Sequence, residues 1–230
     1  MNAGPPRTAL QIAPSILAAD FAVMGDAARA AESAGADALH VDVMDGRFVP
    51  EISFGRRMVE ALRRYTRLPM DVHLMVAKPQ RHVAPFAESG ASAITVHVEA
   101  FSGTVPLRAA LESIRGRGLG AGVALKPATP ASVLDDLWGA FDRVLVMTVE
   151  PGYSGQAFMP EMLSKLRTLV ERRRAESRPV LFAVDGGVDE QTAPLCASAG
   201  ASFLVAGSSV YSPRRSVADG MAALRAVTNR

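Results

Sequence analysis

Residues 33–46, SAGADALHVDVMDG, carry the chain from the end of one expected helix into an expected strand. The small residues around Gly35 are typical of a helix that ends in a left-handed turn. The apolar run that follows is typical of a buried strand. The same small-residue turn recurs at residues 89–92 (SGAS) and 198–201 (SAGA), which indicates a repeated helix–turn–strand unit.

Eight such units follow one another, with a period of roughly 25 to 30 residues that matches one βα unit. We expect strands at residues 10–12, 38–43, 70–74, 93–98, 120–125, 143–148, 179–184 and 202–206. We expect helical segments at residues 21–34, 55–65, 80–88, 104–117, 131–137, 160–174, 190–199 and 213–227. This pattern predicts an α/β fold, a single-domain (β/α)8 TIM barrel. A doubly wound sheet is the alternative, but residues 14–17 (PSIL) are not the Gly-rich turn that it requires.

The composition agrees with one domain. Of the 230 residues, 49% are hydrophobic, which is enough for one large core. No Pro- or Ser-rich linker divides the chain, so we expect residues 1–9 to form a flexible N-terminal tail and residues 10–230 to form the barrel. The short N-terminal segment lacks the long apolar stretch of a signal peptide, and no run is long enough to span a bilayer.

Charge and cysteine content exclude several classes of partner. The net charge is only +2 and aromatic residues make up 6% of the chain, so neither a nucleic-acid groove nor a membrane surface is expected. Cys196 is the single cysteine, which rules out an intrachain disulfide and agrees with a cytoplasmic protein. Its place in a helical apolar pattern predicts that Cys196 packs in the core.

Polar side chains of metal-binding type stand at the ends of three expected strands: His40 and Asp42, His73, and Asp185. In a barrel of this kind the functional groups gather at the C-terminal ends of the strands. Imidazole nitrogen and carboxylate oxygen together suit zinc, iron, manganese or cobalt. A lone histidine or aspartate at a strand end has ordinary structural explanations, but four that converge at one mouth predict a divalent metal site.

The two aspartates also suggest proton transfer. Asp42 and Asp185 belong to strands on different sides of the barrel, so a substrate between them would present one face of a carbon to each. One carboxylate could remove a proton and the other supply one, while the metal neutralises the developing enediolate oxygens. The predicted outcome is inversion at the carbon next to a ketone.

Other residues near these strand ends receive weaker assignments. Met44, Met75 and Met147 either pack in the core or face the mouth, where they would contact substrate and exclude water. Asp71 is expected to lie out of phase with the ligands, and His97 is a possible fifth polar group.

Three Gly-rich segments follow the last three strands: residues 150–156 (EPGYSGQ), 185–187 (DGG) and 206–209 (AGSS). Glycine lets backbone N–H groups approach an anion, and barrels frequently build a phosphate site from their last loops. The combination predicts a phosphorylated small molecule whose far end reaches the metal.

These segments resemble the ribulose-phosphate 3-epimerase family over nearly the whole chain. The resemblance rests on six motifs in order: residues 13–21 (APSILAADF), 40–50 (HVDVMDGRFVP), 73–76 (HLMV), 146–152 (VMTVEPG), 184–187 (VDGG) and 206–208 (AGS). One departure is visible: the family's phosphate loop often reads Gly-Phe-Gly-Gly, and here it is Gly152-Tyr153-Ser154-Gly155.

The resemblance implies a (β/α)8 barrel of the pentose phosphate pathway that interconverts D-ribulose 5-phosphate and D-xylulose 5-phosphate. It implies one divalent metal ion per subunit on His40, Asp42, His73 and Asp185, with Asp42 and Asp185 as acid and base on opposite faces of C3. Ser15 and His73 would contact the substrate, and family members form homo-oligomers. The phosphate would rest on Gly152, Tyr153, Ser154, Gly155, Gly186, Gly187, Gly207 and Ser208.

Three alternatives stay open. A sister epimerase acting on a hexulose phosphate such as D-allulose 6-phosphate would use the same motif residues. A Schiff-base aldolase would use Lys126, at the end of the fifth expected strand, as its nucleophile. A catalytically silent barrel that serves as a binding scaffold is the third, and the intact acid/base pair argues against it.

Overall fold

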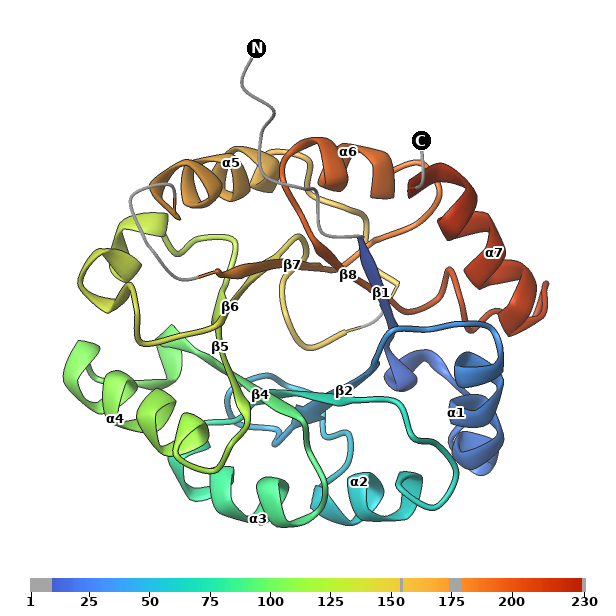
Figure 1. Ribbon diagram of the computed structural model, residues 1–230, viewed down its shortest axis with the longest axis horizontal. Helices are drawn as coiled ribbons and strands as arrows, with labels where there is room; N and C mark the ends of the chain where they lie inside the picture. Colours follow the sequence, from blue (N-terminus) through green and yellow to red (C-terminus); the bar gives the residue numbers. More distant parts are fainter. Residues whose placement is uncertain (1–9, 154, 174–178, 229–230) are drawn as a thin grey trace.

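The eight expected strands form one parallel sheet rolled into a barrel. The computed structural model describes residues 10–153, 155–173 and 179–228, so the predicted tail at residues 1–9 and Ser154 lie outside the described residues. The strands are β1 Gln11–Pro14, β2 Leu39–Met44, β3 Met70–Met75, β4 Ala93–His97, β5 Gly120–Leu125, β6 Arg143–Met147, β7 Leu181–Asp185 and β8 Phe203–Ala206. Figure 1 shows these strands as an inner ring surrounded by helices.

The α-helices follow the strands in alternation, as a TIM barrel requires. They are α1 Met24–Ser33, α2 Arg56–Leu62, α3 Val83–Glu88, α4 Thr104–Arg115, α5 Met162–Arg173, α6 Ala193–Ser198 and α7 Val217–Thr228. Between β5 and β6 the chain instead forms a 3₁₀ helix, Ala131–Leu137. Its apolar residues Leu134 and Leu137 are buried, so the helical pattern predicted there is present in a tighter form.

Burial explains why these segments become strands. All six residues of β2 and all six of β3 are buried, because one strand face meets the helices and the other fills the barrel. The interior cluster includes Ala13, Ala124 and Leu145, whereas a larger cluster packs sheet against helices and contains Cys196. The prediction that Cys196 packs in the core is therefore confirmed.

The barrel is joined unevenly around its circumference. Seven parallel ladders connect the strands in the order β1-β8-β7-β6-β5-β4-β3-β2. Between β1 and β2 the described residues form a single parallel bridge, Ser15 with His40. We call this junction the seam.

Side chains reinforce the seam below the bridge. Asp37 accepts a 2.7 Å hydrogen bond from the Ile12 amide, and its own amide donates to the Ile12 carbonyl at 3.0 Å. Arg225 of α7 pairs with Asp37 and donates to the carbonyls of Leu10 (2.8 Å) and Gly35 (3.0 Å). The C-terminal helix thus ties the two edges of the sheet together.

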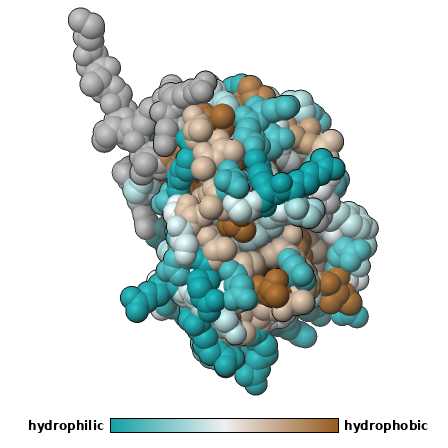
Figure 2. All heavy atoms as spheres, turned by 90° about the vertical axis from the view of Figure 1, so that its right-hand side faces the viewer, coloured by the Kyte–Doolittle hydropathy of each residue, from teal (hydrophilic) through white to brown (hydrophobic). Residues whose placement is uncertain are grey.

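The outer surface is mostly that of solvated helices. Figure 2 shows polar side chains over much of the face that carries α1 and α7, with hydrophobic residues exposed between them. Among the described residues, no helix is long and apolar enough to cross a membrane.

Candidate functional site

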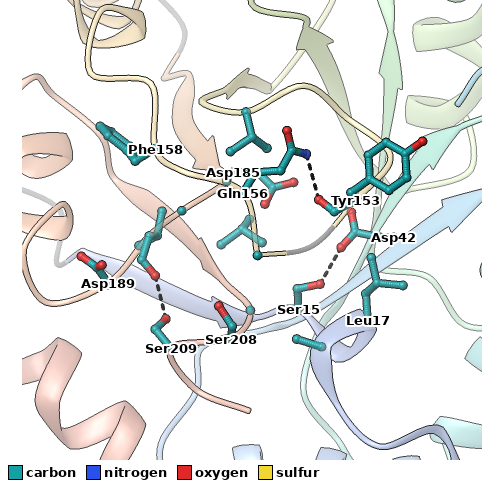
Figure 3. Close-up of a pocket in the computed structure, with 18 of the residues that line it drawn as sticks. Ser15, Leu17, Asp42, Tyr153, Gln156, Phe158, Asp185, Asp189, Ser208 and Ser209 are labelled. Atoms are coloured by element: carbon teal, nitrogen blue, oxygen red, sulfur yellow. Dashed lines mark hydrogen bonds between the residues drawn. The ribbon is translucent and has the colours of Figure 1, made fainter. Parts of the chain in front are cut away.

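A cavity of about 380 Å³ opens at the C-terminal ends of the strands. Its size lies within the range typical of small-molecule sites. Figure 3 shows Asp42 and Asp185 with their carboxylates in this cavity, beside Ser15. The predicted residues that line it are Ser15, Asp42, Met44, Met75, Met147, Gly152, Tyr153, Gly155, Asp185, Gly186, Gly187, Gly207 and Ser208.

The four predicted ligands come together at the cavity floor, where Asp42 and Asp185 line the cavity and His40 and His73 lie behind them. His40, Asp42, His73 and Asp185 each offer one ligand atom, and these atoms all lie within 4.8 Å of one another. Strand geometry brings them there. His40 and Asp42 share a face of β2 because side chains alternate along a strand, and register places Asp42 beside His73. Thr148 fixes the end of β7 by donating to the Asp185 carbonyl at 2.9 Å.

The ring atoms that face the two aspartates are Nε2 of His40 and Nδ1 of His73. Nε2 of His40 lies 3.2 Å from Asp42 Oδ1 and 3.9 Å from Asp185 Oδ2. Nδ1 of His73 lies 3.0 Å and 3.7 Å from the same two oxygens.

The cluster fits a divalent transition metal. Nε2 of His40 is fully buried and has no hydrogen-bond partner among the described residues, so an unsatisfied ring nitrogen faces the two carboxylates, as a cation site requires. Two imidazoles and two carboxylates form a donor set that zinc, iron, manganese and cobalt accept.

His40 is held from behind by a carboxylate. Its Nδ1 lies 2.9 Å from Asp71 Oδ2, and Asp71 forms an ion pair with Arg143 of β6. The guanidinium of Arg143 also stacks on the Phe203 ring at 4.3 Å. Because burial raises the pKa of Asp71 but Arg143 and His40 lower it more, the carboxyl stays ionised. An ionised Asp71 accepts a hydrogen bond from Nδ1–H of His40, which leaves Nε2 as the ring nitrogen that would bind a metal.

The expectation that Asp71 is out of phase with the ligands is wrong. Asp71 and His73 are two residues apart on β3 and share a face, with Asp71 one layer deeper and beside His40 in register. Sequence reasoning also missed Arg143. An arginine at the first position of an otherwise apolar strand indicates a buried carboxylate partner.

His73 is held by a different series of hydrogen-bonded side chains. Its Nε2 lies 2.9 Å from Nε2 of His97, and Nδ1 of His97 lies 3.0 Å from Glu99 Oε2. Glu99 also accepts from the Lys126 amide at 2.8 Å and from the Thr129 hydroxyl. Burial lowers the pKa of His97 to about 4, despite its hydrogen bond to Glu99, so this imidazole is neutral at physiological pH. His97 is thus a polar neighbour of the cluster, and His73, fully buried, does not line the cavity.

The two aspartates of the cluster differ in acidity when the protein side chains are considered alone. Burial opposes ionisation of Asp42, but His40 and His73 outweigh it and hold the pKa of Asp42 far below its usual range. Burial and the nearby charge of Asp42 raise the pKa of Asp185 to about 6. Such a separation is the pattern of an acid and a base in one site.

The far end of the cavity is made of glycine-rich backbone. Gly186 has φ +117°, and a Cβ there would lie 2.5 Å from Cγ2 of Val149. Gly187 has φ +65°, and a Cβ there would lie 2.9 Å from the Phe158 backbone. Only glycine fits both positions, which leaves the loop backbone open to a ligand.

One cation lines the cavity among the described residues, and sequence reasoning missed it. Arg215 pairs with Glu190 and donates to the Ser209 carbonyl beside the glycine loops. Lys126 lies elsewhere: its Nζ stands 4.1 Å from the centre of the Phe48 ring, and it does not line the cavity. This geometry argues against Lys126 as a Schiff-base nucleophile.

Comparison with known proteins places the chain among epimerases. The model of the ribulose-phosphate 3 epimerase family matches residues 11–211. The ribulose-phosphate 3-epimerase of Bacillus subtilis is 45% identical over 205 residues, covering 88% of this chain and 92% of that protein. That of Mycobacterium leprae is 45% identical over 219 residues, covering 95% and 94%.

Solved structures support the fold. KGPDC from Streptococcus mutans in complex with D-R5P superposes with a TM-score of 0.71 at 17% identity, covering 96% of this chain and 98% of that one. A 3-hexulose-6-phosphate synthase superposes with a TM-score of 0.66 at 19% identity, covering 95% and 99%. At these identities the likeness concerns the barrel alone.

Proposed function

Because the chain belongs to the ribulose-phosphate 3-epimerase family and is an epimerase, we propose that it interconverts D-ribulose 5-phosphate and D-xylulose 5-phosphate by two-base proton transfer at C3. The observation that carries this proposal is the pair Asp42 and Asp185, which enter one cavity from β2 and β7. A carbon held between them has a carboxyl group on each face.

Both aspartates can exchange a proton with C3, one on each face, so either one can start as the base. Removal of the C3 proton by one carboxylate gives an enediolate, and protonation from the opposite face by the other completes the inversion. In the reverse reaction the two roles exchange.

The metal would be held by His40, Asp42, His73 and Asp185, one divalent ion per subunit. When bound, such an ion supplies positive charge that stabilises an enediolate. The protein side chains do the rest: Ser15 fixes Asp42, and Met44, Met75 and Met147 keep water from the reacting carbon.

The phosphate would bind at the other end of the cavity, on the backbone of Gly152, Tyr153 and Gly155, with Gly186, Gly187, Gly207 and Ser208 opposite. Ser154 belongs to the same proposed loop. Arg215 adds a positive charge at this end, where Asp189 and Glu190 would otherwise repel the dianion.

A direct assay tests the function. Protein stripped with a chelator and re-supplied with zinc, iron, manganese or cobalt is incubated with D-ribulose 5-phosphate in D₂O. We expect D-xylulose 5-phosphate that carries deuterium at C3. Failure with every metal would refute the proposal, and faster turnover of D-allulose 6-phosphate would move the substrate to the hexulose class.

We also propose that the enzyme acts in the cytoplasm, in the pentose phosphate pathway, as a homo-oligomer. The family membership supports these assignments. Light scattering of the purified protein tests the assembly, and a monomer at micromolar concentration would contradict it.

A further inference from the structure

We propose that Glu99, acting through His97, fixes the tautomer of His73 so that Nδ1 of His73 presents its lone pair to the metal. Glu99 and His97 are positioning residues here, because neither one lines the cavity or belongs to the four-residue cluster. The inference rests on the proposed metal site and explains what holds one of its ligands in the binding-competent form.

The argument begins at the contact between the two imidazoles. Nε2 of His73 and Nε2 of His97 are 2.9 Å apart, which is a hydrogen-bond distance. Such a contact needs one proton between the two nitrogens, since two lone pairs or two protons would repel each other. Either His73 donates to His97 or His97 donates to His73, and only the first leaves Nδ1 of His73 without a proton.

Glu99 decides between these two arrangements. Its Oε2 lies 3.0 Å from Nδ1 of His97, and an ionised carboxylate can only accept. Nδ1 of His97 therefore carries the proton, and Nε2 of His97 is an acceptor. It follows that Nε2 of His73 donates to His97, so Nδ1 of His73, which contacts Asp42 Oδ1 at 3.0 Å, would turn its lone pair to the metal when one is bound.

The surroundings keep Glu99 in this role. The Lys126 amide at 2.8 Å and the Thr129 hydroxyl donate to its other oxygen, Oε1. The Phe48 ring covers His97, with the two ring centres 4.9 Å apart. The hydrogen-bonded series from Glu99 to His73 is thus anchored at its outer end, and its two imidazoles are fully buried.

The two histidine ligands are therefore supported in different ways. His40 donates directly to a carboxylate, Asp71, whereas His73 donates to the imidazole of His97, which in turn donates to Glu99. Outer residues of this kind typically change metal affinity by about 10- to 100-fold when mutated. We place Glu99 at the low end because one ring separates it from the ligand.

The first test is Glu99→Gln, which keeps the shape of the side chain. The amide oxygen can still accept from Lys126 and Thr129, but the amide nitrogen donates to Nδ1 of His97. This reverses the chain and puts a proton on Nδ1 of His73. We expect zinc affinity, measured by competition with a chromophoric chelator, to fall about tenfold. The control Glu60→Gln makes the same change at an exposed glutamate, which pairs with Arg57, and should bind zinc within about twofold of wild type.

A second pair of variants separates the tautomer from the charge of Glu99, which both variants retain. In His97→Gln the amide oxygen can accept from His73 while the amide nitrogen donates to Glu99, so the order of donors is preserved. His97→Leu removes both contacts. We expect zinc affinity within about threefold of wild type for His97→Gln and a loss of about tenfold for His97→Leu.

Nitrogen NMR of histidine-labelled, zinc-loaded wild-type protein shows which ring nitrogen of each histidine carries the proton. This measurement does not depend on the folding of any variant. We expect the proton of His73 on Nε2 and that of His97 on Nδ1. A proton on Nε2 of His97, or unchanged zinc affinity in both Glu99→Gln and His97→Leu, would overturn the proposal. These measurements do not depend on turnover, so a protein that gave the expected result but failed to epimerise pentulose phosphates would contradict only the proposed reaction.

Discussion

The Ser15 hydroxyl donates a 2.5 Å hydrogen bond to Oδ2 of Asp42 across the seam of the barrel. The other oxygen of that carboxylate, Oδ1, faces both His40 and His73. The two oxygens of Asp42 therefore have separate partners, one in the cluster and one in the cavity wall. This arrangement lets one side chain serve the proposed metal and the proposed proton transfer together.

Ser15→Ala should slow epimerisation while metal content stays unchanged. The variant leaves a buried carboxylate oxygen without its donor, which costs about 1–3 kcal/mol, or roughly 5- to 150-fold in rate if the loss falls on the transition state. Steady-state kinetics and metal analysis of the same sample check this. Ser15→Thr keeps the hydroxyl and is the control. A Ser15→Ala enzyme with wild-type kcat would remove Ser15 from the mechanism.

Asp185→Asn should abolish epimerisation but still bind substrate. The amide cannot exchange a proton, whereas the glycine loops that would hold the phosphate are untouched. Turnover should fall by at least about 10³-fold, because the loss of an acid/base group typically costs about 10²- to 10⁴-fold in rate. Calorimetric titration with substrate checks that binding persists. Measurable epimerisation near the wild-type rate would refute the two-base scheme.

Asp71→Asn should destabilise the protein and weaken metal binding together. The change leaves Arg143 buried without its ion-pair partner, a loss of about 3–5 kcal/mol when one member of a buried pair is removed. Chemical denaturation and chelator competition measure the two effects. Asp26→Asn, which breaks the exposed pair with Arg29, is the control and should change stability by less than about 1 kcal/mol. Equal stabilities for the two variants would contradict the role of Asp71.

Gly186→Ala should raise KM for a phosphorylated substrate and lower stability. The added Cβ meets Val149 at 2.5 Å, and its backbone has φ +117°. Gly35→Ala is the matched control because Gly35 also has a positive φ, +76°, but a Cβ there meets nothing within 4 Å. We expect the control to lose stability without a change in KM. A normal KM for Gly186→Ala would mean that this loop does not hold the phosphate.

Cys196 predicts a pH effect of definite sign. Burial raises the pKa of its thiol to about 12, against an ordinary value of 9.0. Above pH 9 the unfolded thiol ionises and the folded one does not, so this group should favour unfolding increasingly as pH rises from about 9 to 12. Cys196→Ala should lack this component in denaturation curves recorded at pH 8 and pH 10. In the native protein at pH 8, a thiol reagent should react only as fast as the chain opens.

The sequence predicts the strands and the ligand cluster well because both depend on short-range patterns. Apolar runs locate the strands, and a spacing of two residues puts His40 and Asp42 on one face. The barrel rule then brings His73 and Asp185 to the same end.

The residues that support the two histidines depend on contacts between different strands, and no local sequence pattern contains such contacts. Asp71 meets His40 through the register of β2 with β3, and Arg143 reaches Asp71 from β6. The same limit applies to Arg215, which enters the cavity from the loop after β8. The sequence also does not predict that residues 131–137 form a 3₁₀ helix, because apolar spacing over seven residues does not distinguish it from an α-helix.

The seam has a consequence for how the protein is made. Arg225, which ties the carbonyls of Leu10 and Gly35 together, is synthesised after every residue of the cluster and cavity. Ser15 and Asp42, on opposite sides of the seam, are among the first residues of the site to leave the ribosome. The hydrogen bond between them gains this brace only after α7 has emerged, so in a nascent chain halted before that helix Ser15 and Asp42 lie on two edges that Arg225 does not yet join.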